Sequence, residues 1–437
     1  MTIGDDEARS LTDVERAPVR TRTSEQVRAG RWQLFALCGT VFLHGWTNGS
    51  VGPLIPKIQE YYGLSYTGVS LVFVLQNVGS VCGSLGIVVL GNRCHLGTLL
   101  ASGSLILVVG SALTAAVPVV PYAVFLAGNY LAGLGLGLLT TQSTGFVAAL
   151  QIGPKTKMGI VQAAFGLGAL LAPIASTRLS QLAGKRWAIS YAIVVGMALL
   201  DTVNLCLIFR RRSQDECLKL SGQQRRNEEE KVEDPDLAAS ESPARSLVRD
   251  LRSMLALPAV HLLAGTLFIC VGTEVVVGGW LVSFLIQVRG GSLKSGYVAS
   301  GYWAGLMLGR LVLLPVNKWI GEVRAIYVYT AGCIGLELII WFVPNFLVCA
   351  IAVSFIGLLI GPMFSIAMND AARILPPRLL TPSISWLSAI AGTGASVLPL
   401  ISGAIAGRTG FKSMQPFTIG SFVFMLVLWT FVPRRRT

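Results

Sequence analysis

A single carboxylate, Glu274, lies in the middle of an apolar run that extends from Pro258 to Val288. A charge at the centre of a bilayer costs about 2.5–3.5 kcal/mol on insertion scales, so acids at that depth usually line a pathway or pair with another group. The functional interpretation of Glu274 is a carboxylate that carries protons or binds substrate. The structural alternative is a carboxylate held by threonine or backbone groups of a neighbouring segment.

A second polar residue, Asn48, occupies the equivalent place earlier in the chain. At one constant offset along the sequence, Asn48 aligns with Glu274. The same offset pairs Phe42 with Phe268, Gly79 with Gly305, Gly83 with Gly309, Gly168 with Gly394 and Pro173 with Pro399. Such matches indicate two parallel repeats, and carriers built from repeats hold their binding site near mid-depth between them. We therefore expect Asn48 and Glu274 to face each other across a central cavity.

Other polar and aromatic residues of the apolar runs could line the same cavity. His44 lies one helical turn before Asn48, and it could carry protons or stay neutral and hydrogen-bonded. The remaining candidates are Gln76, Asn77, Asn129, Gln142 and Gln162 in the first half, with Trp280, Tyr302, Trp303 and Trp386 in the second. Amides and aromatic faces suit hydroxylated rings or flat polycyclic solutes. The alternative for each residue is bonding or packing between helices.

Arg310 is a candidate gating residue. It lies about 6 residues, or about 9 Å, from the cytosolic end of its predicted span, whereas Glu274 lies about 24 Å deep at 1.5 Å per residue. This difference in depth argues against a direct ion pair, and we expect Arg310 to act as a latch near the cytosolic mouth. Asp370 could bond Arg310 or a loop arginine, whereas Asp201 and Glu337 are expected to be structural.

The sequence contains no arrangement of residues typical of an enzyme or a metal site. No Ser/His/Asp or Cys/His set, zinc-ligand spacing or nucleotide-binding motif is present, so we predict no catalytic residue, metal or cofactor. The glycine-rich run from Gly133 to Gly137 lies inside an apolar segment, which favours close helix packing over nucleotide binding. The sequence therefore offers no site at which a nucleotide would be hydrolysed.

The elements that must position these residues are membrane-spanning helices. The chain has 437 residues, of which 53% are hydrophobic and 13% are charged, against about 25% charged in soluble proteins. Runs of roughly 20 apolar residues, the length of a span, occur at 32–54, 66–90, 96–118, 122–149, 157–182, 187–209, 258–288, 295–316, 324–343, 346–370, 383–406 and 415–432. We predict an all-α membrane protein with twelve transmembrane helices in two six-helix halves.

The segments outside the spans complete the predicted organisation. Residues 1–31 are expected to form a disordered cytosolic tail, 32–209 and 258–432 the two bundles, and 433–437 a short tail. Residues 210–257 are expected to form a mainly disordered cytosolic linker, with a short amphipathic helix near Leu247–Leu255.

Lys and Arg concentrate on the side of the predicted membrane that holds both termini and the linker, which predicts that this side is cytosolic. The net charge of +13 is spread over tails and short loops, so nucleic-acid binding is not expected. The lipid bilayer is the expected environment, and a monomer in the plasma membrane is the default prediction.

Four stretches resemble the major facilitator superfamily, in particular its fungal members similar to fucose/glucose/galactose–proton symporters. They are FLHGWTNGSVGPLIPKIQEYYG at Phe42–Gly63, MGIVQAAFGLGALLAPIAST at Met158–Thr177, VGTEVVVGGW at Val271–Trp280 and SGYWAGLMLGR at Ser300–Arg310. The resemblance covers nearly the whole chain except the tails and the linker. It implies two rocking bundles, alternating access and a small-molecule substrate, with protons as a possible coupling ion.

Three departures from that family bear on function. The loop between spans two and three reads LGNRCHLG, with Asn92 where the family usually has an acid and Arg93 retained as a gating candidate. Asn48 and Ser143 stand where the sugar symporters tend to carry acids. With those acids absent, we predict efflux of a metabolite, possibly a secondary metabolite, with Glu274 coupling protons. Uptake of a sugar or polyol, or a transporter-like nutrient sensor, are the alternatives.

Overall fold

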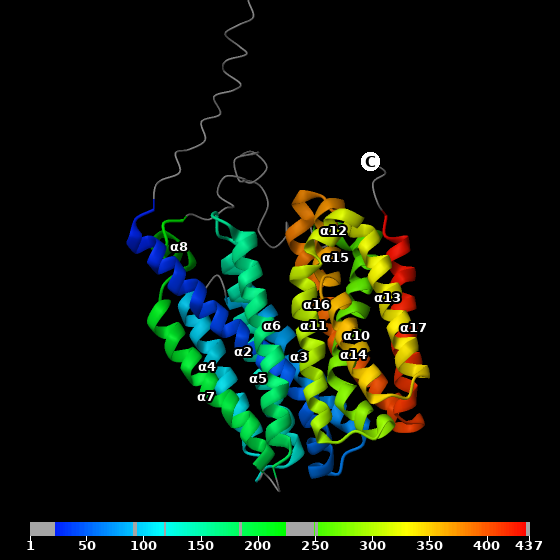
Figure 1. Ribbon diagram of the computed structural model, residues 1–437. Coiled ribbons are helices and arrows are strands. Elements are labelled where there is room, and N and C mark those ends of the chain that lie inside the picture. Colours follow the sequence, from blue (N-terminus) through cyan, green and yellow to red (C-terminus); the bar gives the residue numbers. More distant parts are fainter. Residues whose placement is uncertain are drawn as a thin grey trace, which may run out of the picture.

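All regular elements that the structure describes are helices (Figure 1). The structure is a computed structural model, and it describes residues 22–90, 94–117, 119–182, 186–223, 249 and 252–433. Arg93, residues 1–21 of the predicted tail, the last four residues and most of the predicted linker lie outside these ranges. The predicted all-α fold is confirmed.

The first half of the chain forms six long helices. They are α2 (Ser24–Tyr62), α3 (Tyr66–Leu90), α4 (Leu96–Ala115), α5 (Tyr122–Ala148), α6 (Pro154–Ser180) and α7 (Ile189–Ile208), with a 3-10 turn η1 (Arg186–Ala188) before α7. A short helix, α8 (Gln214–Leu220), follows them. The turn between α2 and α3 begins at Gly63, whose φ of 62° is a left-handed conformation that glycine adopts without strain.

The second half forms the helices α10 (Pro258–Arg289), α11 (Gly296–Val312), α12 (Leu314–Ile320), α13 (Glu322–Phe342), α14 (Phe346–Ile360), α15 (Met363–Ile374), α16 (Pro377–Thr409) and α17 (Met414–Phe431). Two 3-10 turns, η4 (Leu293–Ser295) and η5 (Phe411–Ser413), precede α11 and α17. Helices α11 and α12 are bent by 55° at Leu313, next to Pro315 in the first turn of α12. Proline lacks the backbone N–H that would continue the hydrogen-bond ladder.

Two segments for which disorder was predicted contain helix. The segment 24–31, assigned to a disordered tail, is the first part of α2, because Thr23 and Gln26 form a reciprocal capping box with bonds of 3.0 and 3.3 Å. The segment 214–220, assigned to the linker, is helix α8, which begins with a second capping box between Ser213 and Glu216. Residues 252–255 are helical where a short helix was predicted near Leu247–Leu255.

Among the described residues, ten helices are long and apolar enough to cross a membrane, and the bent pair α11–α12 raises the number to eleven. Helix α2 contains the predicted first span but is not one of them, since polar residues such as His44 and Asn48 interrupt its apolar character. The chain is therefore a multi-pass membrane protein, and the number of twelve spans stays a prediction.

The two halves repeat the same helix contacts. Helix α2 packs along α6, and α10 packs along α16. A side chain added to Gly168 would collide with the carbonyl oxygen of Phe42, and one added to Gly394 would collide with that of Phe268. These are the residues that the constant sequence offset aligns, so the repeat seen in the sequence is also a repeat of packing.

The halves meet at one end of the molecule and draw apart toward the other (Figure 1). The end that carries the start of α2 and the end of α17 is called the terminus-bearing end here, and the opposite one the far end. Toward the far end, α3 packs against α16 and α6 against α11. A Cβ on Gly403 would touch Ser70, and one on Gly296 would touch Thr177, both across the two halves.

Four aromatic rings close the contact between the halves near the far end. Tyr66 and Phe73 of α3 meet Trp280 of α10, with ring centroids 6.3 and 5.9 Å apart, and Phe411 lies 4.7 Å from Tyr66. Edge-to-face pairs at these distances are favourable. These four residues are called the far-end aromatic cluster below.

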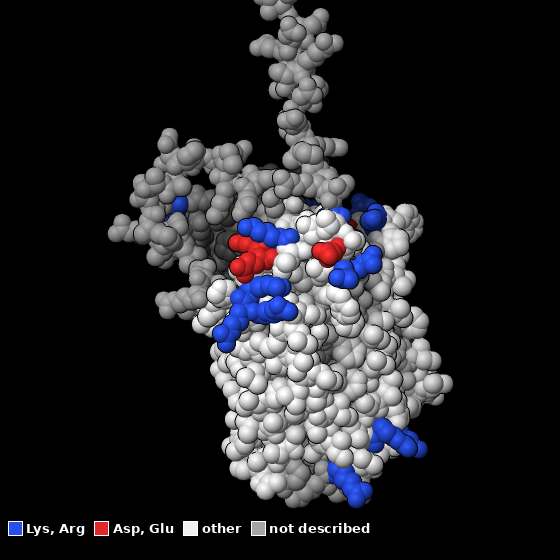
Figure 2. Space-filling model, turned by 90° about the vertical axis from the view of Figure 1, so that its left-hand side faces the viewer, with Lys and Arg blue, Asp and Glu red and all other residues white. Residues whose placement is uncertain are grey.

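Charged side chains avoid the flank of the molecule. Figure 2 shows Lys, Arg, Asp and Glu gathered toward the terminus-bearing end, with a few Lys and Arg at the far end and a broad uncharged flank between them. Large apolar side chains are exposed on both halves, among them Leu200 of α7 and Phe342 of α13, each 72% exposed. So much exposed apolar surface is what lipid contact requires.

Candidate functional site

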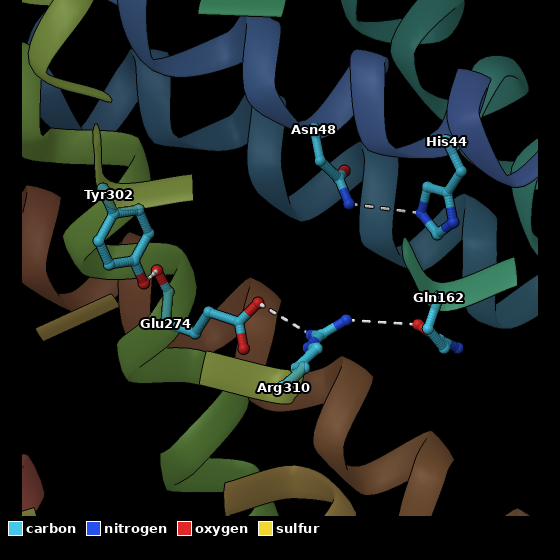
Figure 3. Close-up of polar contacts among 6 residues, drawn as sticks. All are labelled: His44, Asn48, Gln162, Glu274, Tyr302 and Arg310. Atoms are coloured by element: carbon cyan, nitrogen blue, oxygen red, sulfur yellow. Dashed lines mark hydrogen bonds and ion pairs between the residues drawn. The ribbon is translucent and has the colours of Figure 1, made fainter. Parts of the chain in front are cut away.

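A chain of three polar side chains crosses from the second half to the first. Glu274 of α10 lies 4.0 Å from Arg310 of α11, measured from Oε1 to Nη2. Arg310 donates a hydrogen bond of 3.3 Å from Nη1 to Oε1 of Gln162 on α6. Figure 3 shows the guanidinium between the carboxylate and the amide. Arg310 therefore uses separate nitrogens to hold an acid of its own half and an amide of the other.

The prediction that Glu274 and Arg310 do not form a direct ion pair is wrong. The two side chains are 13% and 21% exposed, and they lie within ion-pair distance. The prediction ended the eighth span at residue 316, whereas the bent helix α12 continues that segment to Ile320.

The backbone of Glu274 is fixed by its neighbour helix. The hydroxyl of Tyr302 on α11 donates a hydrogen bond of 2.9 Å to the carbonyl oxygen of Glu274. Tyr302 is fully buried and packs edge-on against Trp303 at 5.5 Å. Tyr302 and Trp303 were predicted to line a cavity, but the structure places them in the packing that holds α10 against α11.

A second set of polar side chains lies in the first half. His44 contacts Thr140 Oγ1 through Nδ1 at 2.9 Å and Asn48 Nδ2 through Nε2 at 3.4 Å. An amide nitrogen donates, so Nε2 accepts, and the remaining ring proton of a neutral His44 lies on Nδ1 toward Thr140. Asn48 in turn accepts a 3.4 Å bond from Gln76. His44, Asn48 and Gln76, each predicted separately as a site residue, thus form one hydrogen-bonded chain (Figure 3 shows His44 and Asn48).

Phe165 of α6 separates the two polar sets and contacts both. Its ring lies 5.3 Å from the ring of His44 and 5.6 Å from the guanidinium carbon of Arg310. The sequence analysis missed both Phe165 and Thr140. Phe165 follows Gln162 by three residues and so shares its helix face, which is the signal that could have found it.

Several other predicted residues bond or pack between helices instead. Asn77 donates to the carbonyl oxygens of Phe73 at 2.9 Å and Ala395 at 3.4 Å, so it links α3 to α16. Asn129 donates to Phe125 within α5. Trp280 belongs to the far-end aromatic cluster and donates to Pro399 at 3.3 Å. These residues therefore make the bonding and packing contacts that were the alternative to lining a cavity.

The remaining predicted residues lie on α5, α15 and α16. Gln142 lies half-buried on α5, and Trp386 lies half-buried on α16 with an indole nitrogen that is shielded from solvent and has no hydrogen-bond partner in the described residues. Asp370 is buried on α15, and Arg373 of the same helix pairs with Glu322 at 2.8 Å.

Two further acids lie away from the interface between the halves. Asp201 accepts hydrogen bonds from Thr40 at 2.9 Å and Ser104 at 3.2 Å inside the first half, which suits a structural role. Glu337 is buried beside a cavity of about 40 Å³ between α10, α13, α14 and α17. Within the described ranges, no three His, Cys, Asp or Glu side chains converge as metal ligands would.

Comparison with known proteins agrees with this geometry. The family model described as Major Facilitator Superfamily matches residues 37–381. The chain is 26% identical to "Bypass of stop codon protein 6" of Saccharomyces cerevisiae, over 92% of this chain and 82% of that protein. It is 25% identical to a "Glucose/galactose transporter" of Brucella abortus, over 90% of this chain and 92% of that one. The solved structure of the E. coli fucose:proton symporter matches 92% of this chain and 98% of its own, with a TM-score of 0.62 at 15% identity, which shows a shared fold.

Proposed function

Because the chain belongs to the Major Facilitator Superfamily, we propose that it moves a small uncharged organic solute by alternating access and couples that movement to protons through Glu274. The observation that carries the proposal is the chain from Glu274 through Arg310 to Gln162. This chain links a titratable carboxylate of the second half, Glu274, to the hydrogen bond that Arg310 makes with Gln162 of the first half. A proton on Glu274 can therefore alter the contact on which the relative position of the halves depends.

The coupling step follows from charge. An ionised Glu274 attracts Arg310, and this attraction is strong because the pair is largely removed from water. When Glu274 takes up a proton, the attraction is lost and Arg310 is no longer held in the position from which it donates to Gln162. The proton leaves from the same oxygen once the site opens to the other side. Uptake and release on opposite sides transfer one proton per cycle.

The solute class follows from the groups around this chain. The carboxylate and the guanidinium balance each other, and the first half contributes a neutral histidine and the amides of Asn48 and Gln76. Donors and acceptors without net charge suit hydroxyl groups of a neutral solute. A saccharide or polyol is the first candidate, and the relative named as a glucose/galactose transporter supports it.

Export of a metabolite is the second candidate. It is favoured by Asn48 and Ser143, which stand where the resembling sugar symporters tend to carry acids. With coupling confined to the second half, proton entry could drive solute exit. A nutrient sensor with this fold would bind solute without net flux, so flux measurements separate it from both carriers.

The test of coupling uses Glu274→Gln in proteoliposomes with an imposed pH gradient and labelled glucose, galactose and xylose. We expect the wild type to accumulate solute, and Glu274→Gln to lose accumulation while retaining solute exchange, because exchange needs no net proton transfer. Asp201→Asn serves as the control, since Asp201 lies away from the interface. Unchanged accumulation in Glu274→Gln would remove Glu274 from the mechanism.

The direction of transport is tested by profiling metabolites in cells and medium of a deletion strain and an overexpressor. A compound retained inside the deletion strain and enriched outside the overexpressor establishes export. A nutrient left in the medium by the deletion strain establishes uptake. We place the terminus-bearing end in the cytosol and the protein in the plasma membrane, and labelling of tags on intact cells tests both placements.

A further inference from the structure

A separate cavity of about 310 Å³ lies at the far end, between the last turns of α2, the start of α3 and the last turns of α10. Its lining comprises Pro56, Gln59, Glu60, Gly63, Leu64, Tyr66, Ser283, Ile286 and Gln287. Ser283 follows Glu274 by nine residues, so the cavity is about 13 Å from the central site along α10. Its volume is in the lower part of the range typical of small-molecule sites.

The lining holds an unsatisfied polar group. Ser283 is only 4% exposed, and its hydroxyl oxygen has no hydrogen-bond partner among the described residues. A buried hydroxyl without a partner is costly, and structures normally satisfy such groups with protein, water or ligand. The hydroxyl oxygen is shielded as it stands, and a rotation of the Ser283 side chain would let it bond an occupant that brings its own hydroxyl or carbonyl groups.

The chemistry of the lining selects an uncharged occupant. The carboxamides of Gln59 and Gln287 each present a donor and an acceptor side by side, which is the pattern that neighbouring hydroxyl groups need. Glu60 is neutralised by Lys57, whose amine lies 2.7 Å from its carboxylate. The apolar faces of Leu64 and other lining residues can cover the C–H face of a sugar ring.

We propose that this cavity is a second binding site for a small, uncharged, polyhydroxylated solute of the monosaccharide class. Both halves contribute to the site, and Tyr66 belongs at once to its lining and to the far-end aromatic cluster. The site is complete only while the halves meet at the far end. A solute bound there stabilises this arrangement, since a ligand shifts the population toward the state that binds it.

The test measures protection of a cysteine placed in the lining. Leu64→Cys is made in a chain whose accessible native cysteines (Cys38, Cys82, Cys94 and Cys206) are replaced by serine, and a membrane-impermeant maleimide is applied from the far-end side. Glucose, galactose, xylose and mannitol are added in concentration series. We expect at least one of them to slow labelling severalfold. Lys294→Cys, on exposed η4, is the control whose labelling stays constant.

Variants of Ser283 decide whether protection comes from this cavity. Ser283→Leu fills the space and should abolish protection, whereas Ser283→Ala removes only the hydroxyl and should weaken it. Ser283→Ala also guards against a folding defect in the larger variant. Protection by none of the four solutes, or protection that persists in Ser283→Leu, would overturn the proposal.

A third comparison separates this site from the central one. In a background with Asn48→Ala and Gln76→Ala, which removes the amides proposed to bind solute at the central site, protection should persist, because neither residue touches the far-end cavity or takes part in the bridge from Glu274 to Gln162. Loss of protection in that background would mean that the solutes act at the central site and change the far end indirectly, and the proposal would then be wrong. Failure of the proton-coupled mechanism appears instead as unchanged pH-driven flux in Glu274→Gln.

Discussion

Arg310 makes two different contacts at once, and the fork of the arginine side chain suits both. Its planar group presents separate nitrogens to Glu274 and Gln162. Lysine would keep the charge but has one nitrogen. A substitution series at this position therefore distinguishes the loss of charge from the loss of the bridge between the halves.

We predict that Arg310→Ala shifts the molecule away from the arrangement seen here. A hydrogen bond to a charged group contributes about 1.5–3 kcal/mol, so the ratio of far-end-closed to far-end-open molecules should fall by roughly tenfold or more. For Arg310→Lys this ratio should lie between the values for Arg310→Ala and the wild type. The measurement is the maleimide accessibility of cysteines placed at each end of the molecule. Identical accessibility in all three proteins would show that the bridge does not set the population.

At this scale the sequence predicted residue types well and contacts less well. An acid alone in an apolar run identifies Glu274, and helical spacing joins His44 to Asn48. The pair of Glu274 with Arg310 was missed because a count of residues from the end of a span does not show how neighbouring helices are staggered. Trp280 was assigned to a cavity because composition does not say which neighbour an aromatic ring meets.

Glycines that face a neighbouring backbone set how closely the helices approach. A Cβ on Gly83 of α3 would collide with the carbonyl oxygen of Leu134 on α5, and one on Gly309 of α11 would collide with that of Leu358 on α14. Small residues allow this close packing in membranes. The sequence predicted it for the run from Gly133 to Gly137, and its contacts with α3 confirm it.

We expect Gly83→Ala to be destabilised and Gly86→Ala to be neutral or slightly more stable. Forcing the helices apart costs about 1–3 kcal/mol, whereas nothing lies within 4 Å of a Cβ on Gly86 and alanine favours helix over glycine. Thermal unfolding of the purified proteins measures the stability of both variants. The comparison is matched, because each variant replaces a glycine of α3 by alanine. Equal melting temperatures for the two variants would contradict the packing seen here.

Helix α8 fastens the segment after α7 to the terminus-bearing end of the first half. Gln33 of α2 donates to the carbonyl oxygen of Cys217 at 2.9 Å, and the backbone nitrogen of Gly97 donates to Arg212 at 3.2 Å. Gln223 accepts from the backbone nitrogen of Ile152 at 3.1 Å. The prediction of a disordered linker failed here because these bonds are made with residues far away in the sequence.

The thiol of Cys217 reports on this attachment. Burial raises the pKa of Cys217 to about 11, so on the order of one molecule in 3,000 carries the reactive thiolate at pH 7.5. In a chain with Cys38, Cys82, Cys94 and Cys206 replaced, we expect Cys217 to be alkylated slowly. Gln33→Leu should increase the rate of alkylation severalfold, because it removes a hydrogen bond that holds α8. Arg28→Ala, at an exposed position on α2, is the control. Fast alkylation of Cys217 in the chain that retains Gln33 would show that α8 is not held against the first half.

At the scale of the whole molecule, the contacts at the far end imply that the halves must part there during transport. Thr177 of α6 and Gly296 of α11 lie side by side across the halves, with 3.1 Å between the Thr177 Cβ and a Cβ on Gly296. This separation is close to the roughly 3.5–4.5 Å found between the Cβ atoms of a disulfide. A bond between these positions would keep the far end closed.

The double variant Thr177→Cys/Gly296→Cys should therefore transport when reduced and stop when oxidised. Reduction should restore transport, and each single variant should be insensitive to the oxidant. The readout is solute exchange in proteoliposomes, which requires both orientations of the site. Exchange that continues after complete crosslinking would mean that the two helices do not separate at this point.

The fold of the whole molecule was the part most open to prediction. Long apolar runs and a constant offset between equivalent residues such as Phe42 and Phe268 are properties of the sequence itself. The first helix was the exception, because its start depends on a capping box at Thr23 that lies in a polar stretch. The relative position of the halves could not be predicted from the pattern of either repeat, because it depends on contacts between the two halves.

The far-end aromatic cluster also has an electrical consequence. Trp280 lies about 9 Å beyond Glu274 along α10, and a plug of aromatic rings conducts ions poorly. Where water reaches the site from the terminus-bearing end, most of the transmembrane voltage falls across this plug. Moving one elementary charge through it is worth about 2.3 kcal/mol per 100 mV. Since protonation of Glu274 leaves Arg310 with an uncompensated charge, whereas the deprotonated pair is neutral, we expect voltage alone, at constant pH, to change how often the protonated carrier reorients.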